Sequence, residues 1–223
     1  MNEYHKKNFN KAFSDNRKTV FAVIGAGGKT SYCFAMASLY ARTGKKVLIT
    51  TSTHMYDTKD TVHVASEVKE AFLSRNIVHA GVPVQDNKIM GFSQEEYLQV
   101  CDSADVIFVE ADGSKGKPFK APSEYEPVIP ENVTRIVLVM GLWAIGKPIK
   151  EIGHRIALIC TILKKDSAEI LTIEDFAFMI KRAYLIPLRE NHPGIPIEVL
   201  LNHGNTPEQV QFARSVSRII YGK

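Results

Sequence analysis

Cysteine is scarce in this chain, and its spacing excludes two kinds of small-protein architecture. The 223 residues contain three cysteines, which are far apart and form no C-x-x-C pair: Cys33, Cys101 and Cys160. An odd number at such spacing argues against a disulfide framework and against a zinc knuckle. We therefore expect three small residues in the core or at its border, in a reducing compartment.

Long apolar runs and a strong charge imbalance are also missing. The apolar run at 136–146 is about half of the ~20 residues that a membrane-spanning helix needs. The charged N-terminal segment "MNEYHKKNFNKAF" has no apolar stretch like that of a signal peptide. A net charge of +4 is too small to indicate a nucleic-acid partner. These absences predict a cytoplasmic protein without membrane or nucleic-acid partners.

Short β-rich apolar runs are present and recur along the chain. Most of them are continuous rather than alternating, which is typical of strands covered on both faces of a mostly parallel sheet. The six runs lie at 19–24, 46–51, 76–80, 105–110, 135–140 and 196–201.

Helix signals lie between several of these runs. A segment rich in Ala, Met and Leu at 30–44 stops at Gly44. Three pairs resemble capping boxes: Ser93 with Glu96, Thr172 with Asp175, and Thr206 with Gln209. The alternation predicts an α/β fold, a three-layer, doubly wound, mostly parallel sheet in a single domain over 1–223. The helical stretch 150–190 is expected to be a small insertion within that domain.

The first apolar run leads into "VIGAGGKTS" at 23–31, for which three interpretations compete. A dinucleotide fingerprint needs a third glycine where Thr30 stands, and an acid where the second run ends in Thr50, Thr51 and Ser52. A purely steric turn needs neither a lysine nor hydroxyls. We favour a shortened phosphate loop of the form G-x-x-G-K-[ST], a length that Mur-type amide ligases use, and hence a fold of P-loop NTPase type.

This loop predicts a set of nucleotide-binding residues. Its glycines would let the backbone approach phosphate, and the helix that follows would point its positive end at the same place. Lys29 would neutralise β- and γ-phosphate oxygens, and Thr30 or Ser31 would offer a hydroxyl to Mg²⁺. The expected contacts are Gly25, Ala26, Gly27, Gly28, Lys29, Thr30 and Ser31.

Two acids end the fourth apolar run, "DVIFVEADGS". If the run is a strand beside the first, Glu110 and Asp112 lie at its carboxyl end, where doubly wound folds bind ligands. The alternative is that they only cap a turn. We predict that Lys29, Glu110 and Asp112 are catalytic and that Thr30, Glu110 and Asp112 serve the metal; which acid binds it stays open.

A long loop at 114–130 follows, carrying Lys115, Lys117 and Lys120. Each lysine alone would be a solvated charge, whereas together they could close over phosphates or a small anionic substrate. The two interpretations are equally supported. The histidines, His54 included, show no ligand cluster.

Several motifs together resemble the YqeC family, the accessory proteins of selenium-dependent molybdenum hydroxylases. They are "VIGAGGKTS", "ITTSTHM", "EADGSKGKPFKAPSEYEPVIP", "VMGLWAIGKPI" and "HR" at 154–155, in that order. The resemblance implies a P-loop-type nucleotide-binding protein that acts in the maturation of a selenium-containing molybdenum enzyme or its selenium cofactor. Such a hydroxylase or its maturation factors would be partners.

The last apolar run departs from the pattern of that family. Relatives end it with an Asn-Lys-x-Asp-like element, which GTPases use to read guanine. Here Asn202 remains, but His203 and Asn205 replace the Lys and Asp. An Asn side chain has one acceptor and one donor group, so it cannot replace the carboxylate that accepts two N–H groups of guanine. We therefore expect ATP rather than GTP, with Asn202 near the base; alternatively Asn202 only ends the strand.

The sequence thus favours an Mg²⁺-dependent ATP-binding enzyme or ATP-driven accessory factor. A non-catalytic module that delivers an anionic cofactor is the second possibility. A Mur-like ATP-dependent ligase is the third, although 223 residues leave little room for its acceptor domains.

Overall fold

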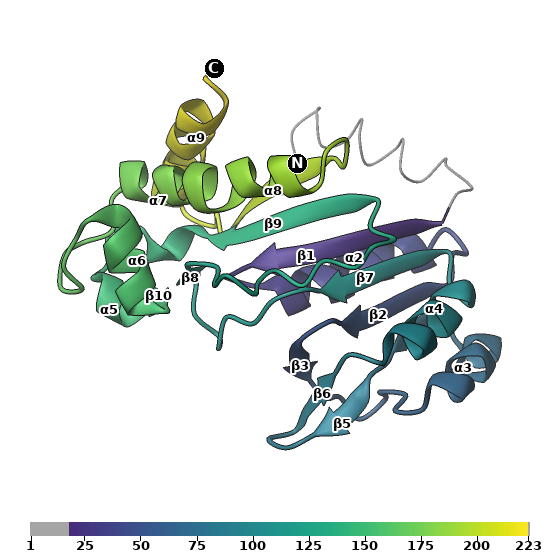
Figure 1. Ribbon diagram of the computed structural model, residues 1–223. Helices are drawn as coiled ribbons and strands as arrows, with labels where there is room; N and C mark the ends of the chain where they lie inside the picture. The colour runs from purple at the N-terminus through teal and green to yellow at the C-terminus, as the bar shows by residue number, and fades with distance from the viewer. Residues whose placement is uncertain (1–17, 223) are drawn as a thin grey trace. The chain divides into compact units, whose positions relative to one another are not determined.

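A computed structural model describes residues 18–222 of the chain (Figure 1). The N-terminal segment on which the prediction about signal peptides rests lies outside these residues. Within 18–222, no helix is long and apolar enough to cross a membrane.

The predicted α/β fold is confirmed, with a six-stranded central sheet flanked by helices. Parallel pairing joins β11 to β9, β7 to β2 and β2 to β4. In sheet order the strands are β11 (Ile197–Asn202), β9 (Arg135–Gly141), β1 (Thr19–Gly25), β7 (Val106–Glu110), β2 (Val47–Thr51) and β4 (Ile77–His79). Each of the six apolar runs forms one of these strands.

Burial explains why those runs are continuous. Every residue of β2 and β7 is buried, and six of the seven residues of β9 are. The edge strand β11 is half-buried along its whole length. Covering a strand on both faces removes the need for alternating polar positions.

The chain divides into two compact units, each made of several segments of the chain. The first comprises the described residues up to Ala22, with 30–111 and 129–135. The second comprises 23–29, 112–128 and the described residues from 136 onward.

The first unit packs helices around an apolar cluster that includes Leu48, Phe72, Val78 and Ile107. Its helices are α2 (Lys29–Ala41), which it holds from Thr30 on, η1 (Ala65–Glu67), α3 (Val68–Ser74) and α4 (Gln94–Asp102). A small antiparallel sheet, visible in Figure 1, has the order β3 (His54–Tyr56), β6 (Lys88–Met90), β5 (Val82–Val84). The predicted capping box at the start of α4 is present.

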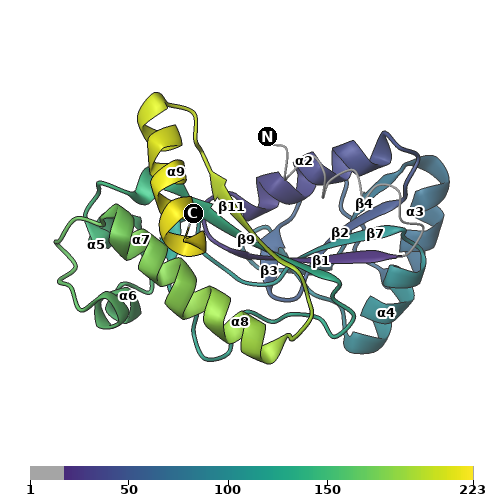
Figure 2. The ribbon, with the colours of Figure 1, turned by 90° about the horizontal axis from the view of Figure 1, so that it is seen from above.

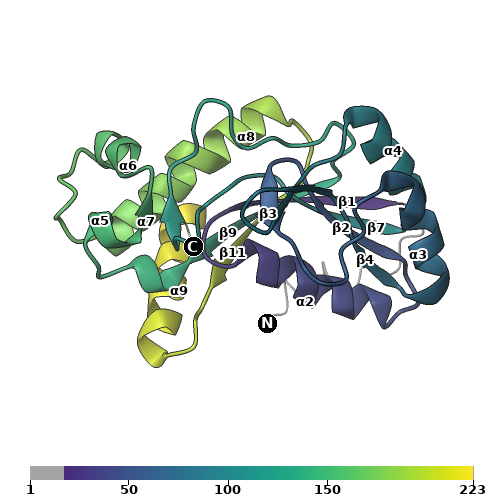
Figure 3. The same cartoon turned by 90° about the horizontal axis from the view of Figure 1, so that it is seen from below.

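The second unit is mainly helical beyond its strands. It contains η2 (Leu142–Ala144), α5 (Ile149–Ile152), α6 (Ile156–Leu163), α7 (Ile173–Met179), the π-helical η3 (Ile180–Leu185), α8 (Ile186–Asn191) and α9 (Pro207–Tyr221). Figure 2 shows α7, η3 and α8 as one almost continuous rod that α9 crosses, and Figure 3 shows α5 and α6 beside α7. The predicted capping boxes of α7 and α9 are both present.

The segment that we expected to be one long loop contains a short strand. β8 (Phe119–Lys120) pairs in parallel with β10 (Gly153–His154), so that Lys120 lies opposite His154. This pairing fixes the middle of the 114–130 segment within the second unit.

Candidate phosphate-binding site

The glycines of the turn between β1 and α2 adopt backbone angles that side chains disfavour. Gly25 and Gly27 have φ of +94° and +90°. A Cβ on Gly25 would lie 2.3 Å from the Val139 carbonyl oxygen, and one on Gly27 would lie 2.5 Å from the Gly141 nitrogen. The turn therefore needs glycine at these positions because its backbone packs against the end of β9. From the sequence we had expected a different reason, namely that glycine lets the backbone approach phosphate.

Asn202, at the end of β11, holds the same turn from another direction. Its Nδ2 donates to the Gly27 carbonyl oxygen at 2.8 Å. A Cβ on Gly28, where φ is +115°, would lie 2.5 Å from this Nδ2. The structure thus places Asn202 against the backbone of the loop, while the exposed Asn205 donates its N–H to Gln209. The expected contact of Asn202 with a base stays a prediction.

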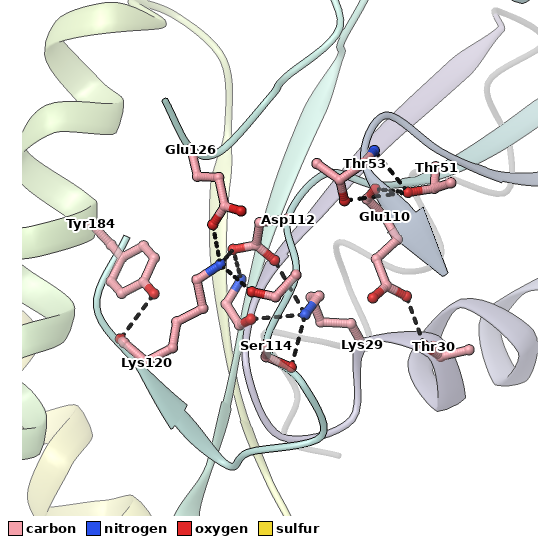
Figure 4. Close-up of polar contacts among 12 residues, drawn as sticks. Lys29, Thr30, Thr51, Thr53, Glu110, Asp112, Ser114, Lys120, Glu126 and Tyr184 are labelled. Carbon is pink, nitrogen blue, oxygen red and sulfur yellow. Dashed lines mark hydrogen bonds and ion pairs between the residues drawn. The ribbon is translucent and has the colours of Figure 1, made fainter. Parts of the chain in front are cut away.

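Lys29 is buried and folds back onto the loop. Its side chain is 3% exposed, and Nζ donates to the Gly25 carbonyl oxygen at 2.9 Å and to the Ser114 hydroxyl at 3.4 Å. Nζ also lies 3.2 Å from Oδ1 of Asp112 (Figure 4). Backbone and carboxylate oxygens thus hold the ammonium of the predicted phosphate-binding lysine.

Asp112 is fully buried and lies beside three donor groups, although its Oδ1 accepts no hydrogen bond and meets Lys29 as an ion pair. Oδ2 accepts the Gly25 N–H at 2.8 Å and lies 2.9 Å from Nζ of Lys120. Together with Lys29 at Oδ1, one carboxylate therefore contacts two ammonium groups and one loop amide. These contacts hold Asp112 beside the turn. They also place two lysine ammonium groups next to its carboxylate.

Lys120 is not the solvated charge that the sequence suggested, nor does it lie on a surface that could close over an anion. Its side chain is fully buried, and Nζ donates to the Gly113 carbonyl oxygen and to Glu126, both at 2.6 Å, and forms an ion pair with Asp112. The buried hydroxyl of Tyr184 donates to the backbone carbonyl oxygen of Lys120 at 3.1 Å (Figure 4). The pairing of β8 with β10 buries Lys120. The sequence around Lys120 gives no sign of this burial.

Glu126 continues the ionic network. Its Oε2 accepts from Nη1 of Arg155 at 2.9 Å as well as from Lys120. Burial raises the pKa of Glu126, but hydrogen bonds and attraction from Arg155 and Lys120 outweigh it and lower the pKa to about 2. Arg155 also donates to the Ala121 carbonyl oxygen at 3.1 Å. Glu126 is therefore ionised throughout the neutral range.

The other two lysines of the segment differ from Lys120. Lys115 is exposed and has a left-handed backbone with φ of 49°. Lys117 is half-buried, and its Nζ donates to the Glu151 carbonyl oxygen at 2.9 Å. Their expected role toward an anionic substrate stays a prediction.

The first unit holds the other predicted acid beside a hydroxyl. The Thr30 hydroxyl donates to Oε2 of Glu110 at 2.7 Å, and Glu110 is 6% exposed (Figure 4). Glu110 ends β7, where its backbone carbonyl accepts the Thr51 hydroxyl at 2.7 Å. Ser31, the other hydroxyl of the motif, is exposed. In the structure, Thr30 rather than Ser31 is therefore the neighbour of Glu110, one of the two acidic residues predicted to serve the metal.

The Thr30–Glu110 pair suits Mg²⁺ by its chemistry. Both groups offer oxygen, and Mg²⁺ is commonly held by one or two protein oxygens while water and substrate phosphates complete its octahedral shell. Over residues 18–222, no group of three or more His, Cys, Asp or Glu side chains is placed to hold a metal.

Among the histidines of the first unit that the structure describes, His79 is the buried one. His79 is 4% exposed, and its Nδ1 lies 2.9 Å from the Thr61 hydroxyl and 3.2 Å from the Thr58 hydroxyl. Burial lowers the pKa of His79 to about 4. His54 is exposed.

Sequence reasoning missed Glu126 and Arg155 as members of the ionic network, although both lie in motifs that carry the family resemblance. Charged residues embedded in "PFKAPSEYEP" and "HR" were the available signal. The partners of Glu126 and Arg155 depend on tertiary contacts, so they could not be assigned from the sequence.

Comparison with known proteins bears out the resemblance. The model of the family described as YqeC protein matches residues 21–157. The uncharacterized protein YqeC of Escherichia coli (strain K12) is 33% identical over 178 residues, which cover 75% of this chain and 70% of that protein. The matched range contains the turn, Glu110, Asp112, Lys120 and Arg155. The chain belongs to the YqeC family.

Proposed function

We propose that this chain binds ATP together with Mg²⁺ and acts as a nucleotide-dependent accessory enzyme. The carrying observation is the position of Lys29, whose ammonium is held inside a three-glycine turn at the start of a 13-residue helix. A lysine at that place, followed directly by a hydroxyl that bonds an acid, matches the parts that phosphoryl transfer requires.

The phosphates would bind at the start of α2. The N–H groups of the first helical turn have no acceptor within the helix, and the helix dipole favours negative charge there. Lys29 would exchange its contacts with Gly25 and Asp112 for phosphate oxygens. A triphosphate carries several negative charges, whereas Gly25 offers a neutral carbonyl and Asp112 keeps Lys120 as a cation, so that exchange is electrostatically favourable.

The metal would bind at Thr30 and Glu110. Asp112 is the poorer ligand because two ammonium groups and an amide already surround its carboxylate. A cation placed there would meet two like charges in a buried setting, where charges are weakly screened. We assign Glu110 to the metal and Asp112 to the lysines.

ATP is favoured over GTP by the end of β11. His203 and Asn205 provide no carboxylate for the two N–H groups of guanine. Asn202, which the family pattern would place near a base, donates instead to Gly27. Base selection would then come from other groups, and discrimination between the two nucleotides would be modest.

The biological role is proposed from the resemblance alone. It is the maturation of a selenium-dependent molybdenum hydroxylase or of its selenium cofactor, with a small anion as the second substrate. The exposed Lys115 is a candidate contact for such an anion, because it directly follows Ser114, which contacts Lys29.

Calorimetric titration of ATP, with and without Mg²⁺, tests nucleotide binding. We expect wild type to bind one ATP, and Lys29→Ala to bind it about a hundredfold more weakly, because one charge-assisted contact with phosphate is lost. Lys69→Ala removes an exposed lysine of α3 and is the matched control, which should bind like wild type. Equal binding by wild type and Lys29→Ala, or none by either, would refute the proposal.

Product analysis separates the enzyme from a delivery module. Release of ADP or pyrophosphate when small anions are supplied indicates an enzyme, and trapping of an acyl phosphate would indicate a Mur-like ligase. Stoichiometric ATP binding without any product would instead indicate a non-catalytic module.

A further inference from the structure

Five charged groups of the second unit form a chain of alternating sign. Contacts of 3.2, 2.9, 2.6 and 2.9 Å connect, in order, Lys29, Asp112, Lys120, Glu126 and Arg155, and Figure 4 shows the first four of these residues. Lys29, Asp112 and Lys120 are each at most 3% exposed. We call these five residues the ionic chain. Its charges interact strongly because water screens them little.

The ionic chain contains three cations and two carboxylates. Arg155 can neutralise Glu126, and Lys120 can neutralise Asp112. Within the ionic chain, the cations therefore outnumber the carboxylates by one. Asp112 is thus shared between two lysines, and Lys29 has the longer of the two contacts, 3.2 Å against 2.9 Å.

Sharing the carboxylate decides how firmly Lys29 is held. Without Lys120, the buried Asp112 would have Lys29 as its one ammonium partner in the chain, and moving Lys29 toward phosphate would leave a buried carboxylate without a cation. Such an uncompensated charge is strongly unfavourable. With Lys120 present, Asp112 keeps a cation and the Gly25 N–H while Lys29 moves.

We propose that Lys120 is a positioning residue that frees Lys29 for phosphate by neutralising Asp112. Lys120 touches no phosphate in this account, because Gly113, Asp112 and Glu126 surround its ammonium. The proposal rests on the proposed function for its ligand, but its physical content, weaker retention of Lys29, can be measured without nucleotide.

The decisive variants remove Lys120 without leaving Glu126 short of a partner. Lys120→Met alone would also remove one of the two cations that contact Glu126, so it is made together with Glu126→Gln, and Glu126→Gln alone is its reference. The same pair is then made in an Asp112→Asn background, where the Asn oxygen still accepts the Gly25 N–H but carries no charge.

Affinity for MgATP, measured by calorimetry alongside each thermal midpoint, gives the first readout. In the Asp112 background we expect Lys120→Met/Glu126→Gln to bind about tenfold more weakly than Glu126→Gln, a typical coupling between groups in contact. In the Asp112→Asn background the same comparison should change affinity less than about twofold. A merely structural role would weaken binding equally in both backgrounds.

Acylation of Lys29 by acetic anhydride, followed by mass spectrometry, gives a second readout without nucleotide. With the rate of Lys69 as internal reference, Lys29 should react about threefold more slowly in Lys120→Met/Glu126→Gln than in Glu126→Gln, because Asp112 then holds it more tightly. Equal or faster acylation would overturn the proposal.

The two readouts separate the two claims. If wild type and Lys29→Ala bind ATP equally or not at all, the proposed function fails, and the acylation comparison still decides the role of Lys120. If Lys29 is required for ATP but the loss on removing Lys120 is equal in both Asp112 backgrounds, the proposal about Lys120 fails and the function stands.

Discussion

Glu110 and Asp112 are two residues apart and both are buried, yet their surroundings differ in kind. Glu110, in the first unit, accepts a hydrogen bond from the hydroxyl of Thr30. Asp112, in the second unit, contacts two lysine ammonium groups and a backbone amide. A carboxylate beside a hydroxyl combines two kinds of oxygen that suit a metal, whereas the two ammonium groups beside Asp112 would repel a metal cation. Glu110 and Asp112 look equivalent in "EADGS", but the groups that contact them in the structure are different.

The largest effect should come from removing the carboxylate that the lysines share. Asp112→Ala would leave the buried ammonium groups of Lys29 and Lys120 with too little negative charge. We expect it to lower the free energy of unfolding by about 3–5 kcal/mol, the cost of breaking a buried pair by removing one partner. Urea denaturation measures this.

Asp102→Ala is the control for that experiment. Asp102 pairs with Lys18, but its side chain is 86% exposed. Its removal should change the free energy of unfolding by less than about 1 kcal/mol, as for surface pairs. Similar losses in the two variants would show that Asp112 is not the centre of the buried network.

A smaller effect should come from the hydroxyl beside Glu110. Thr30→Val keeps the shape of the side chain but removes one oxygen from the proposed metal site. We expect the gain in ATP affinity that Mg²⁺ provides to shrink about tenfold, since a ligand that touches the metal is lost. Ser31→Ala, which removes an exposed hydroxyl, should leave the gain unchanged. Loss of the gain in Ser31→Ala instead would reassign the metal ligand.

The smallest effect concerns pH and again depends on partners. Hydroxyls rather than a carboxylate contact Nδ1 of His79, and burial lowers its pKa from 6.5 to about 4. The unfolded chain therefore binds more protons between these values, so stability falls as pH drops from about 6.5 to 4. The slope from this one group is at most about 1.4 kcal/mol per pH unit.

Denaturation at pH 7 and pH 5 checks this slope. His79→Gln should lose less stability between the two pH values than wild type does. His54→Gln alters an exposed histidine and should behave like wild type. An unchanged pH dependence in His79→Gln would show that His79 does not carry the acid sensitivity.

Much of the fold could be predicted because its signals are local. The runs at 105–110 and 135–140 became β7 and β9, since strands buried on both faces must be apolar throughout. Capping boxes at Ser93 and Thr172 were legible because their partners are three residues away. Residues 114–130 were expected to form one loop because the partner of β8 is β10, more than thirty residues later.

The sequence predicted which residues belong to the candidate site, but it did not predict which of them contact one another. Lys29 and Thr30 follow from a local motif, and Glu110 from its place at the end of a strand. The burial of Lys120 could not be predicted, because a lysine is almost never fully buried unless tertiary contacts pair it. The glycines were recognised, but the close approach of β9 and Asn202 that requires them depends on the folded sheet.

The most direct test compares the two acids by the Mg²⁺ dependence of ATP affinity. The account predicts that Glu110→Gln loses most of the gain in affinity that Mg²⁺ gives to wild type, about tenfold or more. Asp112→Asn, which keeps an acceptor for the Gly25 N–H, should retain that gain within about twofold. Loss of the gain in Asp112→Asn, with Glu110→Gln like wild type, would contradict the assignment of Glu110 to the metal and Asp112 to the lysines.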